Sequence, residues 1–140
     1  MQVDPRGQRF SAAVTTVVLA IVLVTGSLWL LVAQAVVFAA GALAGLRYAP
    51  YGLLYARFVR PRLGPPAELE DAAPPRFAQG VGLVFALAGV LGYVLGVTWL
   101  GMAATAAALA AAFLNAAFGF CLGCEMYLII VRFRPSRSRV

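Results

Sequence analysis

Two long apolar segments with almost no charge constrain this chain more than any other feature. No charged residue occurs from Phe10 to Leu46, and from Val97 to Val131 the only one is Glu125. A helix that spans a bilayer needs about 20 apolar residues, so the first segment fits two short spans. As one helix the second segment would be about 50 Å long, against a hydrocarbon core of ~30 Å. These lengths predict a helical membrane protein.

The composition supports this prediction. Apolar residues make up 63% of the 140 residues and charged residues only 11%, whereas soluble domains average ~45–50% and ~25%. A soluble chain of this length could not bury so much apolar surface, so the lipid bilayer is the expected solvent.

Turn signals divide the chain into four transmembrane helices arranged as two tandem hairpins. Thr25-Gly26-Ser27 is turn-prone, and Trp29 follows it as an aromatic at the headgroup level would. Trp99 marks the corresponding turn of the second hairpin. We therefore expect an all-α fold in a single transmembrane domain over 1–140. Its expected parts are helices at about 10–26, 28–46, 77–96 and 98–120, a loop at 47–76, a CxxC segment at 119–131 and a basic tail at 132–140.

The central loop and the third helix carry further signals. From Leu53 to Arg62, apolar and aromatic residues alternate with arginines, which favours a short helix lying in the membrane interface. Prolines after Gly64 predict an irregular connection up to the third helix. Within that helix, Gly92 and Gly96 form a GxxxG motif that lets helices approach closely. Intramolecular packing and a homodimer both fit these glycines.

Arginine placement predicts the orientation. All eleven cations are arginines, and the net charge is +6. They lie at Arg6 and Arg9, in the 47–76 loop and in the 132–140 tail, whereas the two turns carry none. The positive-inside rule therefore places both termini and the loop in the cytoplasm, for a multi-pass protein of the plasma (inner) membrane. The charge is explained by anionic lipid headgroups, so we expect no nucleic-acid partner.

A faint internal repeat relates the two halves. Arg9-Phe10 opens the first hairpin as Arg76-Phe77 opens the second. The stretch from Tyr55 to Pro61 closes the first half much as that from Tyr127 to Pro135 closes the second. Two helices per unit give two copies in the same orientation, a parallel repeat. The CxxC has no thiol counterpart in the first half, where Pro50-Tyr51-Gly52 stands.

Cys121 and Cys124 form the CxxC motif and are the only cysteines. On a helix, residues three apart share a face, and their thiols can form a disulfide. At the start of a helix the pair would resemble the redox-active CxxC of thioredoxin-like folds, although no βαβ pattern is present. Packing of two small side chains at a helix crossing is the alternative interpretation.

Glu125 follows the motif directly. An acid in an apolar segment usually has a partner or a function. It is either an interfacial residue paired with an arginine or a proton acceptor for the neighbouring thiol. Our candidate catalytic residues are therefore Cys121, Cys124 and Glu125. The arginines of the 47–62 and 132–134 segments are the candidate cations for a reactive thiolate.

Metal and cofactor chemistry has little support. The chain has no histidine, and structural zinc usually takes four cysteine or histidine ligands, which one chain cannot supply here. The sequence also has no P-loop, no GxGxxG after a strand and no Ser/His/Asp set. We expect no metal and no cofactor, and these patterns leave open whether the chain is an enzyme.

The stretches from Asn115 to Tyr127, from Pro61 to Asp71 and from Pro74 to Gln79 carry a family resemblance. They are similar to the bacterial membrane-protein family catalogued as domain of unknown function 4395. The resemblance extends over nearly the whole chain and includes the CxxC and Glu125. It implies genomic proximity to thioredoxin-like proteins and thiosulfate sulfurtransferases.

These observations lead to one main functional prediction. The cytoplasm-facing CxxC would handle thiol–disulfide or sulfane-sulfur chemistry with a soluble thioredoxin-like or sulfurtransferase partner. The alternatives are a small transporter of a sulfur oxyanion such as thiosulfate, and a structural membrane anchor for soluble partners.

Overall fold

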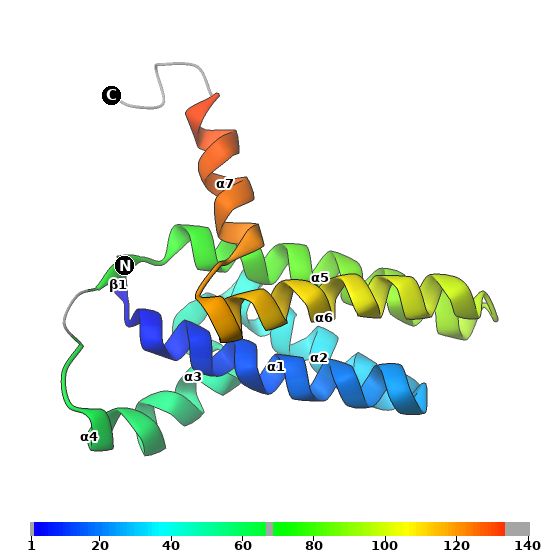
Figure 1. The fold of residues 1–140 in the computed structure, drawn as a ribbon, viewed down its shortest axis with the longest axis horizontal. Helices are drawn as coiled ribbons and strands as arrows, with labels where there is room; N and C mark the ends of the chain where they lie inside the picture. Colours follow the sequence, from blue (N-terminus) through cyan, green and yellow to red (C-terminus); the bar gives the residue numbers. More distant parts are fainter. Residues whose placement is uncertain (1, 67–68, 134–140) are drawn as a thin grey trace.

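The computed structural model describes residues 2–66 and 69–133, which fold into helices apart from one short strand pair (Figure 1). The strands β1 (Gln2–Val3) and β2 (Glu70–Asp71) are antiparallel. The α-helices are α1 (Pro5–Thr25), α2 (Leu28–Ala39), α3 (Pro50–Leu54), α4 (Arg60–Leu63), α5 (Ala73–Val94), α6 (Thr98–Phe118) and α7 (Leu122–Arg132). Tighter or wider helical turns lie between them at Ala40–Ala44, Leu46–Tyr48 and Tyr55–Val59. The predicted all-α class is confirmed.

Three of these helices, α1, α5 and α6, are long and apolar enough to cross a membrane. A fourth apolar helix, Leu28–Ala44, is shorter and consists of α2 with the π-helical turn that continues it. These helices indicate a multi-pass membrane protein.

The turn between α1 and α2 lies where the sequence predicts it. Gly26 is left-handed, with φ of 68°, and its N–H donates to the carbonyl of Val22 at 2.7 Å. The Ser27 hydroxyl then accepts the N–H of Leu30 and caps α2. A glycine at the first position and a small hydroxyl residue at the second are what a helix end and a helix start require.

The long helices pack across the two halves as well as within them. Helix α6 lies between α1 and α5, and α5 also packs on α2. Leu19 and Val22 of α1 meet Leu31 of α2 in the buried core. A Cβ on Gly82 of α5 would lie 2.7 Å from the Phe38 ring, so this glycine serves packing within the chain.

The termini side of the bundle carries the central segment. In Figure 1 the start of α1, α3, α4 and α7 lie toward one end, and the two tight turns lie at the other. Residues 50–63 are helical throughout, in keeping with the short helix expected there. Helix α5 begins at Ala73, earlier than the predicted residue 77, with Pro74 and Pro75 in its first turn. The expected irregular connection is therefore shorter than predicted, because proline fits a first turn, where its missing N–H has no helical acceptor.

Asp4 fastens the central segment to α1. Its side chain is buried, caps α1 through the N–H of Arg6 and accepts the Tyr55 hydroxyl at 2.9 Å. The Arg6 guanidinium bonds Asp4 at 3.0 Å and the Gly64 carbonyl at 2.9 Å, and Arg60 lies 3.7 Å from the carboxylate. The hydrogen bond from Arg6 lowers the pKa of Asp4, and burial raises the pKa of Tyr55.

Reciprocal contacts repeat between the two halves. The Arg9 guanidinium donates to the Ala116 carbonyl, 3.1 Å away, at the end of α6. The Arg76 guanidinium donates to the Ala42 carbonyl, 2.7 Å away, at the end of the helix that α2 begins. A cation at a helix C-terminus complements its unpaired carbonyls and its dipole. Each half therefore supplies the arginine that completes a helix end of the other.

The aromatic contacts follow the same repeat. The rings of Phe10 and Tyr55 are 5.8 Å apart between centroids, and those of Phe77 and Tyr127 are 5.6 Å apart. Each pair joins the first helix of one half to the helix that closes that half. The internal repeat predicted from the sequence thus has a counterpart in matched contacts.

Candidate functional site

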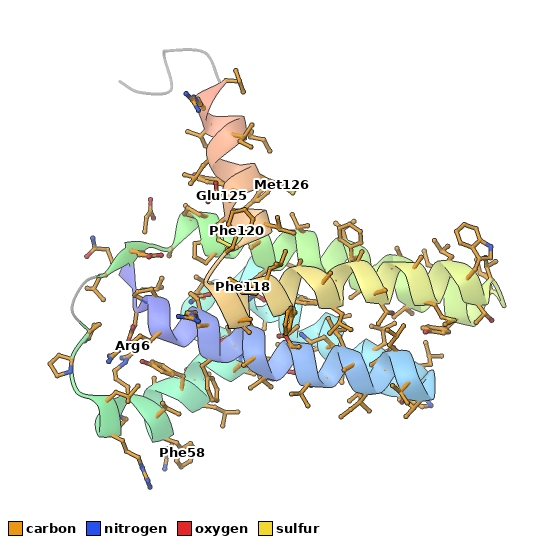
Figure 2. All side chains as sticks on the ribbon, in the orientation of Figure 1. Arg6, Phe58, Phe118, Phe120, Glu125 and Met126 are labelled. Carbon is orange, nitrogen blue, oxygen red and sulfur yellow. A yellow bond between two sulfur atoms is a disulfide. The ribbon has the colours of Figure 1, made fainter. Side chains whose placement is uncertain are left out.

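The second apolar segment breaks at the CxxC motif. Helix α6 ends at Phe118, and Gly119 is left-handed, with φ of 68°, and donates its N–H to the Asn115 carbonyl. Helix α7 starts at Leu122 and leaves across the long axis of the bundle (Figure 1). Figure 2 shows Phe118 and Phe120 beside the bend. The second apolar segment, which is too long for one plain span, is thus divided by a turn between two helices.

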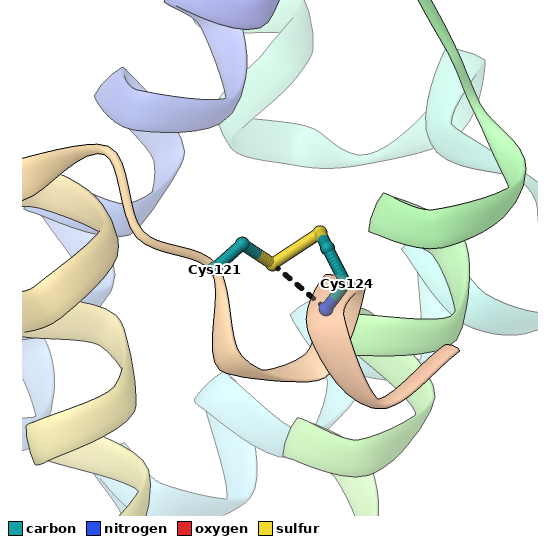
Figure 3. The surroundings of a disulfide bond; sticks show 2 residues. All are labelled: Cys121 and Cys124. Carbon is teal, nitrogen blue, oxygen red and sulfur yellow. Dashed lines mark hydrogen bonds between the residues drawn. A yellow bond between two sulfur atoms is a disulfide. The ribbon is translucent and has the colours of Figure 1, made fainter. Parts of the chain in front are cut away.

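Cys121 and Cys124 form a disulfide at the start of α7, with their Cα atoms 5.1 Å apart. Cys121 is the N-cap residue, and its Sγ accepts the N–H of Cys124 at 3.1 Å (Figure 3). Both residues are partly buried. Unpaired amides and the helix dipole favour a negative charge at a helix N-terminus, so the position suits a Cys121 thiolate.

Gly123, between the two cysteines, sets the position of α7 against α5. It is buried, and a Cβ there would lie 2.6 Å from both the Cα and the Cβ of Ala78. The contact between Phe77 and Tyr127 lies one turn further along α7. Only glycine allows this close approach, which holds the disulfide against the first turns of α5.

The disulfide lines a cavity of about 680 Å³. The cavity extends from β2 and the first turn of α7 along α1 as far as Thr15, between α1, α5 and α6. Small side chains on one face of α6 leave this space. They belong to Ala107, Ala108, Ala111 and Ala112. The alanine-dense part of α6 therefore forms one wall of the cavity.

The described charged residues around the cavity are mostly acidic, whereas the sequence interpretation expected a cation beside the cysteines. Among the described residues, the lining includes Glu70, Asp71 and Glu125 and a single arginine, Arg9. A Cβ on Gly119 would lie 3.8 Å from Nε of Arg9, so this guanidinium lies beside the bend. The described residues of the 47–62 and 132–134 segments, where the sequence interpretation sought the cation, are not part of this lining. The signal that could have found Arg9 is its match to Arg76 in the repeat.

Glu125 lies in the first turn of α7, and its side chain is exposed (Figure 2). The ion pairs among the described residues all involve Asp4, so the predicted pairing of Glu125 with an arginine is not found there. Arg134 lies outside the described residues. The structure thus brings Glu125, Cys121 and Cys124 to one cavity, and within the described residues the exposed carboxylate makes no ion pair.

Two polar residues of the apolar segments behave differently from each other. Gln34 of α2 accepts a hydrogen bond from the Tyr51 hydroxyl of α3 at 2.7 Å. The Asn115 side chain instead lines the cavity and has no hydrogen bond within the described residues.

The match between the chain and a family model extends over residues 3–132. The chain belongs to the family described as a domain of unknown function, DUF4395. This confirms the predicted resemblance. None of the curated proteins and none of the solved structures compared with the chain matches it. In this DUF4395 chain, no group of three or more histidine, cysteine, aspartate or glutamate residues that could hold a metal occurs among residues 2–66 and 69–133.

Proposed function

We propose that the protein is a membrane thiol–disulfide relay that exchanges electrons with a soluble, thioredoxin-like partner through Cys121 and Cys124. The observation that carries this proposal is the position of the pair. A disulfide at a helix N-terminus, with an amide directed at Cys121 Sγ, is what a redox-active pair needs and what simple packing does not.

The exchange has two steps. A partner thiolate attacks one sulfur of the Cys121–Cys124 disulfide, forms a mixed disulfide and releases the other cysteine as a thiolate. The second thiolate of the partner then attacks the partner's first sulfur within the mixed disulfide. This attack releases the bound cysteine of the membrane protein as a thiolate. The partner leaves as a disulfide, and two electrons rest on Cys121 and Cys124. The N-terminus of α7 stabilises the Cys121 thiolate.

Glu125 is the proposed proton acceptor and donor for the pair. It lines the same cavity, is exposed and lies in the first turn of the same helix. A carboxylate there can take the proton of a thiol before attack and return it after release.

The proposed setting is the plasma (inner) membrane, with four spans and both termini in the cytoplasm. Support comes from the arginines, which lie in the terminal and central segments and not in the two turns. The disulfide lies at the end of the bundle that carries these segments. Cytosolic disulfides are usually transient and catalytic, which agrees with a relay.

Two other functions have weaker support. Transport of a sulfur oxyanion would use the cavity, but the described charged residues that line it, three carboxylates and one arginine, oppose an anion. A structural anchor would not explain a redox pair at a helix start. Persulfide transfer from a sulfurtransferase would use the same cysteines, and it differs from the relay because it leaves one sulfur atom on the protein.

The test is mixed-disulfide trapping with a thioredoxin-like dithiol protein in membranes. For trapping, Cys121 of Cys124→Ala is first converted to its mixed disulfide with thionitrobenzoate, and the second cysteine of the partner is replaced by alanine. The partner thiolate then displaces thionitrobenzoate from Cys121, and we expect the covalent complex to accumulate because neither protein keeps a second thiol to release it. Cys121→Ser should abolish the complex while the protein still inserts. Ile129→Ala, at an exposed position of α7 outside the cavity, is the control and should behave as the unmodified protein.

Two results would contradict the relay. One is full complementation of a deletion strain by both Cys121→Ser and Cys124→Ser. The other is a pair that thiol trapping never finds oxidised in native membranes. A persulfide on Cys121, seen as a mass increase of one sulfur, would instead favour sulfane-sulfur transfer.

A further inference from the structure

The cavity beside the disulfide is larger than thiol exchange requires. Its volume of about 680 Å³ lies within the range of ~300–1,000 Å³ typical of small-molecule sites. From this cavity and the disulfide on its wall, we propose that it binds a lipid-soluble quinone, which accepts the electrons of the Cys121–Cys124 dithiol. This inference rests on the proposed relay and names where its electrons go.

The walls suit an amphipathic, ring-shaped ligand. The lining is mostly apolar and includes the rings of Phe38 and Phe85 and the small side chain of Ala111. Polar side chains of α1, α5 and α6 lie among these apolar ones. A quinone combines a carbonyl-bearing ring with an apolar tail, and aromatic side chains favour stacking on such a ring.

Several polar side chains in the cavity have no hydrogen-bond partner among the described residues. They belong to Ser11, Thr15, Gln79 and Asn115. None of the four side chains makes a hydrogen bond within residues 2–66 and 69–133. Polar groups between membrane helices normally bond one another. Two amides and two hydroxyls without partners can donate hydrogen bonds to quinone carbonyl oxygens.

Charge distinguishes a quinone from an anionic ligand. A quinone is neutral, so Glu70, Asp71 and Glu125 do not repel it as they would repel an oxyanion or a phosphate. The carboxylates can also supply protons, which a quinone takes up when it is reduced.

The reaction balances without another reactant. The S–H bonds of Cys121 and Cys124 break and one S–S bond forms, which releases two electrons and two protons. The quinone takes up both, forms two O–H bonds and leaves as a hydroquinone. The partner then reduces the disulfide again, so each turnover moves one electron pair from a soluble dithiol into the membrane.

The test uses the full chain in lipid nanodiscs, reduced and then freed of reductant. Decylubiquinone is added, hydroquinone is followed by absorbance, and thiols are followed by maleimide gel shift. We expect one hydroquinone per disulfide formed. Ala111→Phe fills the cavity and should slow this oxidation by about tenfold or more, because overpacking a site costs affinity on that scale. Ala110→Phe, on the exposed side of α6 outside the cavity, should oxidise at the unmodified rate.

A second measurement identifies the occupant without relying on turnover. A photoreactive azidoquinone should label the α6 segment of the oxidised protein, and decylubiquinone should compete where decanol does not. Equal competition by decanol would mean that the cavity holds only an acyl chain and would overturn the inference. Absence of hydroquinone from a protein that still exchanges with a thioredoxin-like dithiol would also overturn it but leave the relay standing. Absence of that exchange would overturn the relay itself.

Discussion

The two halves of the molecule end in equivalent helices that are held very differently. In the first half, α3 begins after the N-cap residue Ala49, and Tyr55 follows six residues after that cap. In the second, α7 begins after the N-cap residue Cys121, with Tyr127 at the same spacing. Tyr55 is only 2% exposed and donates a hydrogen bond to Asp4. Tyr127 is partly exposed; its ring packs on Phe77, and its hydroxyl makes no hydrogen bond among the described residues.

The difference shows where a duplicated scaffold has room for chemistry. Beside α3, the Tyr51 hydroxyl reaches into the bundle and bonds Gln34. Beside α7, the bundle instead contains the cavity, with the disulfide on its wall. One copy is locked by buried polar contacts, and the other is left open.

The largest effect is expected when the CxxC motif is moved from the start of α7 to the start of α3. Ala49→Cys with Gly52→Cys places a CxxC at the start of α3, in a chain that also carries Cys121→Ser and Cys124→Ser. We expect quinone-dependent oxidation no faster than in the chain without cysteines, because neither position lines the cavity. Hydroquinone formation measures it. Restored activity would show that a helix N-terminus is sufficient and that the cavity is unnecessary.

The buried contacts of Asp4 in the first half should make the largest contribution to the free energy of unfolding. Asp4→Asn leaves Arg6 and Tyr55 without their charged acceptor, and we expect a loss of about 2–5 kcal/mol in unfolding free energy. Thermal unfolding in detergent measures this loss. An unchanged midpoint would mean that the Asp4 contacts do not hold α3 and α4.

The same carboxylate predicts a pH dependence. The folded-state pKa of Asp4 lies below its ordinary value of 3.8 because Arg6 bonds it. Its stabilisation is therefore present above pH 3.8 and is lost as the pH falls through the folded-state pKa. The difference between the unmodified protein and Asp4→Asn should shrink in that acid range. A difference that stays constant down to the folded-state pKa would exclude this cause.

Two glycines, one near the start of each closing helix, test how tightly that helix is packed. Gly123→Ala puts a Cβ 2.6 Å from Ala78, and we expect a cost of about 1–3 kcal/mol and slower thiol exchange. Gly52→Ala meets nothing closer than 3.8 Å and should be neutral or stabilising by about 0.5–1 kcal/mol. Equal effects of the two substitutions on unfolding would remove the distinction between α3 and α7.

The two reciprocal arginines should give the smallest effects. Arg9→Gln and Arg76→Gln each remove a cation from a helix end, at a cost of about 0.3–1 kcal/mol because both contacts are exposed. Thiol exchange should slow in Arg9→Gln and not in Arg76→Gln, since only Arg9 lies beside the bend. Thiol-exchange kinetics in the two variants measure this difference. Identical rates would mean that the guanidinium beside the bend does not affect thiol exchange.

Much of the fold could be predicted because it follows from local features. The length of the segments without charged residues predicts the apolar helices. Gly26 and Gly119 mark the turns where a residue with left-handed backbone conformation is needed. The early start of α5 at Ala73 could not be found by counting prolines, because a proline in a first turn and a proline in a loop look the same in sequence.

The site could be predicted only in part. Cys121, Cys124 and Glu125 are adjacent in sequence, so their proximity needs no fold. Arg9 and Asn115 reach the cavity only because α1 packs on α6, which is a long-range contact that no local pattern encodes. The cavity itself forms where the alanine face of α6 is not filled by large side chains from α1 and α5. The sequence does not show which face of α6 this is.

The exchange of arginines between the halves has a consequence for biosynthesis. Arg76 donates to the Ala42 and Leu43 carbonyls, at the end of the helix that α2 begins. During synthesis these carbonyls lack this donor until the central segment and Arg76 have left the ribosome. The end of α6 depends in turn on Arg9, which was made first. A gene split within the central segment should therefore yield two fragments that survive in cells only when both are expressed.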